Sequence, residues 1–289
     1  MFDATKDPHL VPFSGDYSVA AAATAPPKHG IDNLRKALDE QVEQIAELQR
    51  VLYAHNRYSV LLVFQAMDAA GKDSTIRKVL SGVNPAGCQV VSFKRPSATE
   101  LDHDFLWRTA RRLPERGRIG VFNRSHYEEV LVVRVHPGIL DRQRLPDAID
   151  RDTIWTQRFD SIRDHEKHLA RNGTVILKFW LNVSREEQTR RFISRLETPR
   201  KRWKFSADDI REAEHWDAYM RAYEEVLNAT SVPWAPWYAI PADDKPYMRY
   251  SVARIVAATL AGLDADYPPP DELDEAEVRE CLKSLKNSG

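Results

Sequence analysis

Short, continuous runs of apolar residues recur along the chain, separated by segments with helical periodicity. The first run, Ser59–Phe64, is bounded by a turn, as expected of a strand buried on both faces of a sheet. Four later runs predict further strands of the same kind: Gln89–Phe93, Ile119–Phe122, Thr174–Leu181 and Trp237–Ile240. Strands of this type are typical of a parallel sheet.

Helices are predicted where apolar residues recur at spacings of three and four. Between Ile31 and Asn56, such a series begins with Leu34, Leu38 and Val42. The same periodicity predicts helices at Asp73–Ser81, Thr99–Arg112, Ser125–Val135, Pro146–Ala170, Ser184–Leu196, Ala207–Leu227 and Pro246–Leu263. Strands that alternate with helices form βαβ units, in which helices cover both faces of a parallel sheet. We therefore predict an α/β fold with three layers, α/β/α.

The chain is predicted to form one domain with an extension at each end, since 289 residues suffice for one large α/β domain. We interpret residues 1–30 as an N-terminal arm that can pack in part on the domain, residues 31–265 as the domain, and residues 266–289 as an acidic C-terminal tail. No apolar run approaches the roughly 18 residues of a membrane span, and no signal peptide is visible. The two cysteines lie far apart, so we expect free thiols in a reducing cytoplasm.

Charge is strongly segregated along a chain whose net charge is only −1. This near-neutral total argues against a general nucleic-acid binder. Between Arg185 and Lys204, however, eight Lys or Arg residues stand against three Glu, whereas residues 264–289 contain eight Asp or Glu and three Lys or Arg. A basic block within a neutral protein favours a site for a polyanionic ligand; the alternative is a solvated helix face.

The strongest chemical signal is Ala66-Met-Asp-Ala-Ala-Gly-Lys-Asp-Ser-Thr75, between the first predicted strand and a helix. A phosphate-binding loop requires this context, because N–H groups of the loop and of the helix N-terminus point at the anion. Gly71 allows close approach, and Lys72 places an ammonium on the transferring phosphate. Ala66 replaces the usual first glycine, and Asp73 intervenes before the serine. The alternative is an ordinary helix that Asp73 caps.

A carboxylate, Asp68, lies within this predicted loop. Beside bound phosphates its charge is repulsive unless a metal ion or a proton intervenes. We therefore predict that Asp68 holds Mg²⁺, directly or through water, or orients the attacking phosphate. Asp68 and Lys72 are thus candidate catalytic residues. The predicted phosphate-binding residues of the loop are Ala70, Gly71, Lys72, Asp73 and Ser74.

A second motif, Asn123-Arg-Ser-His-Tyr-Glu128, follows the third predicted strand. P-loop proteins carry a second acidic motif at the end of a neighbouring strand, where this chain has Asn123 in place of an aspartate. The amide weakens the metal-binding charge there and leaves more of that role to Asp68. Arg124 can clamp phosphate oxygens in a fork and is predicted to be catalytic. Glu128 lies one turn later on the same face, and the alternative is a simple ion pair between the two residues.

Together these motifs resemble the polyphosphate kinase 2 family. The matching pieces are Met-Asp-Ala-Ala-Gly-Lys-Asp-Ser-Thr, Asn-Arg-Ser-His-Tyr-Glu, Phe93-Lys-Arg-Pro96 and Glu197-Thr-Pro-Arg-Lys-Arg-Trp-Lys204. Their joint occurrence is far more specific than any one of them, and they cover most of the chain from about residue 30 to 260. The resemblance implies a P-loop kinase-like fold with a small helical lid, Mg²⁺ as cofactor, and polyphosphate and nucleotides as substrates. Asn123 resembles the subgroup that phosphorylates both nucleoside mono- and diphosphates.

The basic segment after the fourth predicted strand is expected to form the lid, at about residues 184–210. Arg191 and Arg195 lie four residues apart on one predicted helix and share a face. We predict that these two, with Lys201, swing over the phosphates on closure, neutralising charge and excluding water. As exposed charges they should contribute only about 0–1 kcal/mol to folding.

A polymer with a negative charge on every unit needs a row of cations rather than one pocket. Lys94 and Arg95 follow the end of a predicted strand, at the sheet edge where α/β proteins bind ligands. The row is predicted to consist of Lys72, Lys78, Lys94, Arg95 and Arg124.

We predict direct, in-line transfer of phosphate between polyphosphate and adenine nucleotides, with guanine nucleotides as a further possibility. The residues of the nucleotide site and lid are predicted to be Asn123, Glu128, Arg191, Arg195 and Lys201. We expect a cytoplasmic homo-oligomer without nucleic-acid or membrane partners. Two alternatives remain. One is an ATP-dependent nucleotide or small-metabolite kinase on the same fold, which has no need of so basic a lid. The other is a non-catalytic anion-binding protein built on a decayed P-loop.

Overall fold

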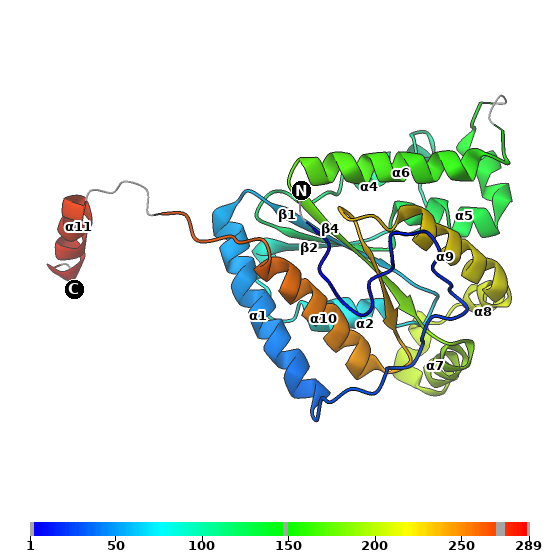
Figure 1. Ribbon diagram of the computed structural model, residues 1–289, viewed down its shortest axis with the longest axis horizontal. Coiled ribbons are helices and arrows are strands. Elements are labelled where there is room, and N and C mark those ends of the chain that lie inside the picture. The colour runs from blue at the N-terminus through cyan, green and yellow to red at the C-terminus, as the bar shows by residue number, and fades with distance from the viewer. Residues whose placement is uncertain (1–2, 147–149, 270–274, 288–289) are drawn as a thin grey trace.

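Five parallel strands form the sheet at the centre of the molecule (Figure 1). The computed structural model describes residues 3–146, 150–269 and 275–287. The strands are β1 (Ser59–Gln65), β2 (Cys88–Ser92), β3 (Ile119–Asn123), β4 (Thr174–Asn182) and β5 (Trp237–Pro241). Their order is β2-β3-β1-β4-β5, and every neighbouring pair is parallel. The predicted strands and the parallel sheet are thus confirmed.

Burial differs sharply between β2 and the other strands. β1, β3, β4 and β5 are buried along almost their whole length, as continuous apolar runs require in a sheet covered on both faces. β2 is an edge strand in which Gln89, Val90 and Ser92 are exposed, so the prediction that it is buried on both faces is wrong. A short apolar run carries no information on which strands lie beside it.

Helices cover both faces of the sheet, which confirms the three-layer α/β/α fold. On one face, α1 (Leu34–His55), α2 (Lys72–Val79) and α10 (Lys245–Ala261) pack against one another (Figure 1). On the other face, α6 (Ile154–Arg171) packs against α9 (Trp216–Thr230), and the short α5 (Val132–Val135) also contacts α9.

The predicted helix Thr99–Arg112 is wrong. This segment contains two short helices instead, α3 (Ala98–Leu101) and α4 (Trp107–Ala110). Between them, the Asp104 side chain accepts hydrogen bonds from the backbone N–H groups two and three residues later, both at Oδ1. Such local bonds favour a turn over a continuous helix.

Two further predicted helices are divided. Ser125–Val135 contains a 3-10 turn, η2 (His126–Glu129), before α5, and Ala207–Leu227 contains α8 (Ala207–Glu214) and α9, which meet at His215. Part of the predicted helix Pro146–Ala170 falls on residues 147–149, which lie outside the described residues. The remaining elements are η1 (Pro85–Gly87), η3 (Pro137–Gln143), α7 (Arg185–Glu197), η4 (Pro199–Lys204) and α11 (Glu275–Asn287).

Part of the N-terminal arm, dark blue in Figure 1, lies along the outer edge of β5. Leu10 forms an antiparallel bridge with Tyr238, and the N–H of the fully buried Val11 donates to the carbonyl of Trp237 at 2.9 Å. The arm therefore pairs with an edge that would otherwise present unpaired backbone groups. α11, in contrast, is exposed along its length and stands away from the sheet (Figure 1). Among the described residues, no helix combines the length and apolar character needed to cross a membrane.

Candidate active site

The carboxyl ends of the five strands meet at one edge of the sheet, where a cleft of about 910 Å³ opens. α/β proteins bind ligands at this edge. The cleft is lined by the loop after β1, by Lys94 after β2 and by Asn123 and Arg124 at the end of β3. Residues of α7 and η4, after β4, and Lys245, after β5, line it as well.

The loop between β1 and α2, residues 66–71, has the backbone of a phosphate cradle. Ala69 and Gly71 have positive φ angles of 63° and 107°. At Gly71 this angle would strain any side chain, and an added Cβ would lie only 3.3 Å from Met248 Cε. The hydroxyls of Ser74 and Thr75 each donate to the Gly71 carbonyl at 3.0 Å, which fixes the first turn of α2 against the loop. The predicted strand-loop-helix arrangement is therefore present.

Lys72, the first residue of α2, is turned into this loop. Its Nζ donates to the carbonyl oxygens of Ala66 at 2.7 Å and Met67 at 3.3 Å. The side chain is buried. Burial, and secondarily the charge of Arg124, lower the pKa of Lys72 to about 8. A bound phosphate would give this ammonium a charged partner in place of two neutral carbonyls.

This low pKa predicts an alkaline limit to activity. The Lys72 ammonium is charged below pH 8 and loses its proton above it, so kcat/KM should be flat at neutral pH and fall about tenfold per unit well above pH 8. The limit in kcat should lie at higher pH, because bound phosphates stabilise the charged form. Steady-state rates measured from pH 6.5 to 10 test this expectation.

A Lys72→Arg variant is the control for the assignment, because a guanidinium stays charged throughout this range. Whatever activity it retains should show no limit near pH 8. If the limit stays in place, another buried group is titrating, and Lys72 is not the residue responsible.

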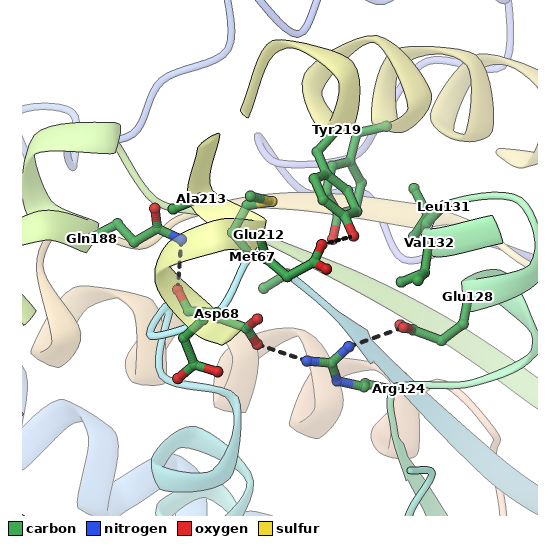
Figure 2. A pocket seen from close by; sticks show the side chains of 13 residues that line it. Met67, Asp68, Arg124, Glu128, Leu131, Val132, Gln188, Glu212, Ala213 and Tyr219 are labelled. Carbon is green, nitrogen blue, oxygen red and sulfur yellow. Dashed lines mark hydrogen bonds and ion pairs between the residues drawn. The ribbon is translucent and has the colours of Figure 1, made fainter. Parts of the chain in front are cut away.

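Arg124 lies between two carboxylates at the mouth of the loop (Figure 2). Its Nη2 donates to Asp68 Oδ1 at 2.6 Å and its Nη1 to Glu128 Oε2 at 3.0 Å. Glu128, more than Asp68, raises the pKa of Arg124 above its ordinary value. The ion pair between Arg124 and Glu128, considered as the alternative above, is therefore present, but it is one half of a three-residue bridge. The guanidinium is already oriented at the cleft that it lines.

A narrow cavity of about 20 Å³ adjoins this bridge and is lined by its three residues together with residues of α8 and α9 (Figure 2). The Tyr219 hydroxyl donates to Glu212 Oε2 at 2.7 Å. Burial raises the pKa of Tyr219 and of Tyr223, so both hydroxyls stay protonated at neutral pH. A cavity of this volume holds about one water molecule, so any larger ligand requires α8 or α9 to move.

Asn123 connects the second motif to the phosphate loop. Its Nδ2 donates to Asp73 Oδ1 at 2.7 Å and, more weakly, to Ser92 Oγ at 3.4 Å. Residues that the sequence placed in separate motifs thus lie side by side, as expected when β1 and β3 are parallel neighbours.

A fully buried polar network holds the second motif, residues 123–128, against β4. Lys178 Nζ, in the middle of β4, donates to the Tyr127 hydroxyl at 2.8 Å, to Glu166 Oε2 at 2.7 Å and to the Thr230 carbonyl at 2.8 Å. Tyr127 in turn donates to Glu166 Oε1 at 2.8 Å. These bonds fix η2, which begins two residues after Arg124 and carries Glu128. Burial lowers the pKa of Lys178 to about 8 as well, which is why the Lys72→Arg control above is needed.

Arg191 is not the exposed lid residue that the sequence predicted. It is buried, and its Nη1 donates to the carbonyls of Ala69 at 3.2 Å and Ala70 at 2.6 Å. Its Nη2 donates to the Ala242 carbonyl at 2.5 Å and its Nε to Glu187 Oε1 at 2.7 Å. Arg191 therefore ties α7 to the phosphate loop and to the end of β5. Helical spacing placed it beside Arg195 but could not show that backbone carbonyls surround it.

The remaining predicted residues divide into two groups. Arg195 and Lys201 line the cleft with Lys94, and Arg195 Nη1 lies 3.4 Å from Asp209 Oδ2. Arg95 is exposed and does not line it. Lys78 also lies outside the cleft.

Lys78 contacts α1 rather than the cleft. Its Nζ lies 2.7 Å from Asp39 Oδ1, which ties α2 to α1. This ion pair joins residues far apart in sequence, and periodicity alone cannot reveal it.

Other residues of the cleft were missed. These include Glu187, Arg190, Ser194, Asp209 and Lys245. Arg200 and Trp203, which also line the cleft, belong to the basic segment in which the sequence placed the lid. A usable signal existed for Lys245, because it follows a predicted strand as Lys94 does. None existed for Asp209, which reaches the cleft from α8.

A strand-loop-helix cradle with a buried lysine, at the carboxyl edge of a parallel sheet, defines a P-loop kinase-like protein. Residues 30–267 match the model of the polyphosphate kinase 2 family. The chain belongs to this family, which confirms the resemblance noted from its motifs.

Individual relatives agree with this membership. An ADP-polyphosphate phosphotransferase of Rhodopseudomonas palustris is 57% identical over 255 residues, which span 88% of each chain. An AMP/ADP-polyphosphate phosphotransferase of Meiothermus ruber is 45% identical over 237 residues, which span 82% of this chain and 85% of the relative. The crystal structure of polyphosphate kinase 2 from Arthrobacter aurescens TC1 superposes with a TM-score of 0.80 at 34% identity, covering 97% of this chain and 99% of that one.

Proposed function

We propose that this protein is a Mg²⁺-dependent phosphotransferase that moves phosphate between inorganic polyphosphate and the nucleotides AMP and ADP. Family membership and the names of the relatives support transfer between polyphosphate and a nucleotide. The observation that carries the proposal is the convergence of Lys72 and Arg124 on one cleft whose other walls also carry cations. Such a cleft suits two polyanionic substrates at once.

The roles of the residues follow from their positions. Backbone N–H groups of the loop and the Lys72 ammonium bind the phosphoryl group, and Arg124 leaves its carboxylate partners for the phosphoryl oxygens. Glu128 holds Arg124 ready until the substrates enter. The terminal oxygen of the nucleotide attacks the terminal phosphoryl group of the polymer in line, and the shortened polymer leaves. Positioning and charge stabilisation account for catalysis of such a transfer.

Asp68 fits a site for Mg²⁺. One of its carboxylate oxygens bonds Arg124, and among the described residues no hydrogen bond engages the second. The described residues contain no cluster of three or more metal-binding side chains. Mg²⁺ is usually held by one or two carboxylates and completed by substrate phosphates and water, so a single carboxylate beside a phosphate cradle is sufficient. When bound, the ion would neutralise the charge that develops on the phosphates.

Asp68→Asn should weaken the apparent affinity for Mg²⁺ and lower the rate, about tenfold or more at limiting Mg²⁺, because the amide loses the charge that attracts the ion. Rates measured across a Mg²⁺ titration test this. Glu128→Gln is the matched control, since it removes the other carboxylate bound to Arg124. An unchanged Mg²⁺ dependence in Asp68→Asn would leave Asp68 with a purely positioning role.

We place the nucleoside end of the acceptor beside Glu128, Tyr219 and Glu212. Carboxylates there repel a polyphosphate but accept hydrogen bonds from ribose hydroxyls. The small volume of the cavity requires α8, which carries Glu212, to move when the acceptor enters.

Product analysis tests the proposal directly. Polyphosphate or ATP is offered as donor with AMP, ADP, GMP or GDP as acceptor, and the nucleotides formed are separated and quantified. We expect turnover with polyphosphate and both adenine acceptors. Turnover with ATP but not with polyphosphate would favour the ATP-dependent kinase. No Mg²⁺-dependent turnover with any pair would favour the non-catalytic anion-binding protein.

We also propose a cytoplasmic homo-oligomer. The outer edge of β2 pairs with no other strand among the described residues, and Cys88–Ser92 contains no charged residue or proline to discourage pairing. Light scattering in solution measures the oligomeric state, and a monomer at micromolar concentration would contradict the proposal.

A further inference from the structure

A second group of basic side chains lies outside the row predicted from the sequence. Lys245 and Arg249 stand four residues apart on α10, and therefore on one face of that helix. Arg77 lies on α2, one turn after Ser74 of the phosphate loop. α2 and α10 pack against each other beside α1 (Figure 1). The three cations thus follow the seam between these helices.

These cations have no carboxylate partners. Among the described residues, no ion pair engages Arg77, Lys245 or Arg249, and the buried Nε of Arg249 has no hydrogen-bond partner. Burial lowers the pKa of Lys245, and the charges of Arg191, Arg249 and Lys201 act in the same direction, while the carboxylate of Glu187 opposes them. Burial likewise lowers the pKa of Arg249, with Arg77 and Arg191 as the next causes. The seam therefore holds like charges close together at an electrostatic cost that a bound polyanion would relieve.

The nearby carboxylates are occupied elsewhere. Asp244 accepts from the Tyr247 N–H as the cap of α10, and Asp243 accepts from the Ser184 N–H. Lys78, the neighbour of Arg77 on α2, is paired with Asp39. Asp243 and Asp244 keep their charge, and Glu187 is paired with Arg190 and Arg191. Among the described residues, however, none of these three carboxylates forms an ion pair with Arg77, Lys245 or Arg249, whereas the adjacent Lys78 is paired.

The seam is continuous with the active-site cleft. Lys245 and Lys201 line the same cleft as Gly71 and Lys72. From Lys245 the row continues to Arg249 and, across the seam, to Arg77. A chain of phosphates that begins in the loop could therefore leave it along the seam and meet a cation at each step.

The opposite exit is less suitable for a polyanion. Past Lys94 and Arg95, a smaller cavity is lined by the carboxylates of Glu100, Asp104 and Glu129. Only part of this charge is balanced: Arg108 lies 3.4 Å from Glu100 Oε1, and Arg158 contacts Glu129. That cavity therefore has three carboxylates against two arginines, and both arginines are already paired, so it offers a polyphosphate less than the seam does.

We propose that the distal units of a polyphosphate donor bind along the seam between α2 and α10, on a cationic row formed by Lys201, Lys245, Arg249 and Arg77. This inference rests on the proposed function and refines it, because it replaces Lys78, Lys94 and Arg95 as the path of the polymer. The outer cations contact only units far from the reacting phosphate. They therefore determine affinity for long donors and leave the chemistry of the terminal unit unchanged.

The test compares a long polyphosphate with tripolyphosphate as donor for the double variant Arg77→Gln/Arg249→Gln. The KM for the long donor should rise about tenfold or more, and its dependence on salt should weaken, because two cation–phosphate contacts are lost. The KM for tripolyphosphate, and kcat with either donor, should change less than about twofold. Binding of the long polymer can also be measured without nucleotide, by its competition with a fluorescent polyphosphate. Its affinity for the double variant should fall in parallel with the rise in KM.

Lys36→Gln/Lys78→Gln is the matched control, because it removes two positive charges from neighbouring α1 and α2 that are already paired with carboxylates. It should leave both donors unaffected. Equal losses in the control would mean general attraction by net charge and would overturn the inference. The inference would also be overturned if the KM of Arg77→Gln/Arg249→Gln for the long donor stayed within twofold of wild type. The same holds if Lys94→Gln, rather than the double variant, raised the KM for the long donor but not for tripolyphosphate. If the wild-type protein uses neither donor, it is the proposed function that fails.

Discussion

Replacing Lys72 with alanine should lower turnover by at least roughly 100-fold, the scale of removing one strong charge contact to a transition state. The ammonium is turned into the phosphate cradle, and its two present partners are neutral carbonyls of Ala66 and Met67. If the phosphoryl group gains negative charge in the transition state, the Lys72 ammonium stabilises the transition state more than the ground state.

The fold should survive this substitution. Loss of Lys72 removes two hydrogen bonds but also removes a charge from a buried position, and these effects oppose each other. Lys72→Met is the matched control, since it keeps most of the buried stem without the charge. Both variants should be equally inactive and melt close to wild type by circular dichroism. Activity within a few-fold of wild type in either variant would remove the assignment of the phosphate loop.

The second large effect concerns stability. Arg191→Gln should lower the free energy of unfolding by about 2–4 kcal/mol, because it breaks a buried charge network, takes the donor from several backbone carbonyls and leaves Glu187 with Arg190 alone. For a domain of this size, that corresponds to a fall in Tm on the order of 5–10 °C. Thermal unfolding followed by circular dichroism measures it.

Arg195→Gln provides the comparison, since Arg195 is one turn away on the same helix. Its side chain is a quarter exposed, and its guanidinium makes one long contact with Asp209 and lies 5.7 Å from the centroid of the Phe192 ring, so its loss should cost no more than about 1 kcal/mol. Equal melting temperatures for the two variants would contradict the view of Arg191 as a structural tie. The earlier expectation that both arginines contribute little to folding would then be correct.

Much of the fold could be predicted from the sequence because a buried parallel sheet has a local signature. Each inner strand is a continuous apolar run, and βαβ order then places all carboxyl ends at one edge. The convergence of the loop near Lys72 with Asn123 and Arg124 followed from that rule. The exposure of β2 could not be predicted in this way. Its apolar run looks like those of the other strands, and only the order of the strands in the sheet makes it an edge strand.

Side-chain partners were harder to predict, for a physical reason. Whether an arginine is mobile or fixed depends on which backbone carbonyls surround it, and those of Ala70 and Ala242 reach Arg191 from other parts of the chain. Lys78 was assigned to the phosphate path from its distance to the loop in sequence, whereas a helix packed beside it supplies Asp39. In both cases tertiary contacts decided the role.

The pairing of the N-terminal arm with β5 has a consequence for how the chain folds during synthesis. Leu10 is made early, yet its partner Tyr238 belongs to the last strand, and the Thr5 hydroxyl contacts that of Thr259 at 2.8 Å. At roughly 5–20 residues per second, the ribosome produces β5 about 10–50 s after the arm. The arm must remain unpaired for that time, and contacts of such sequence separation form slowly. The sheet is therefore closed at this edge only after nearly the whole domain has emerged.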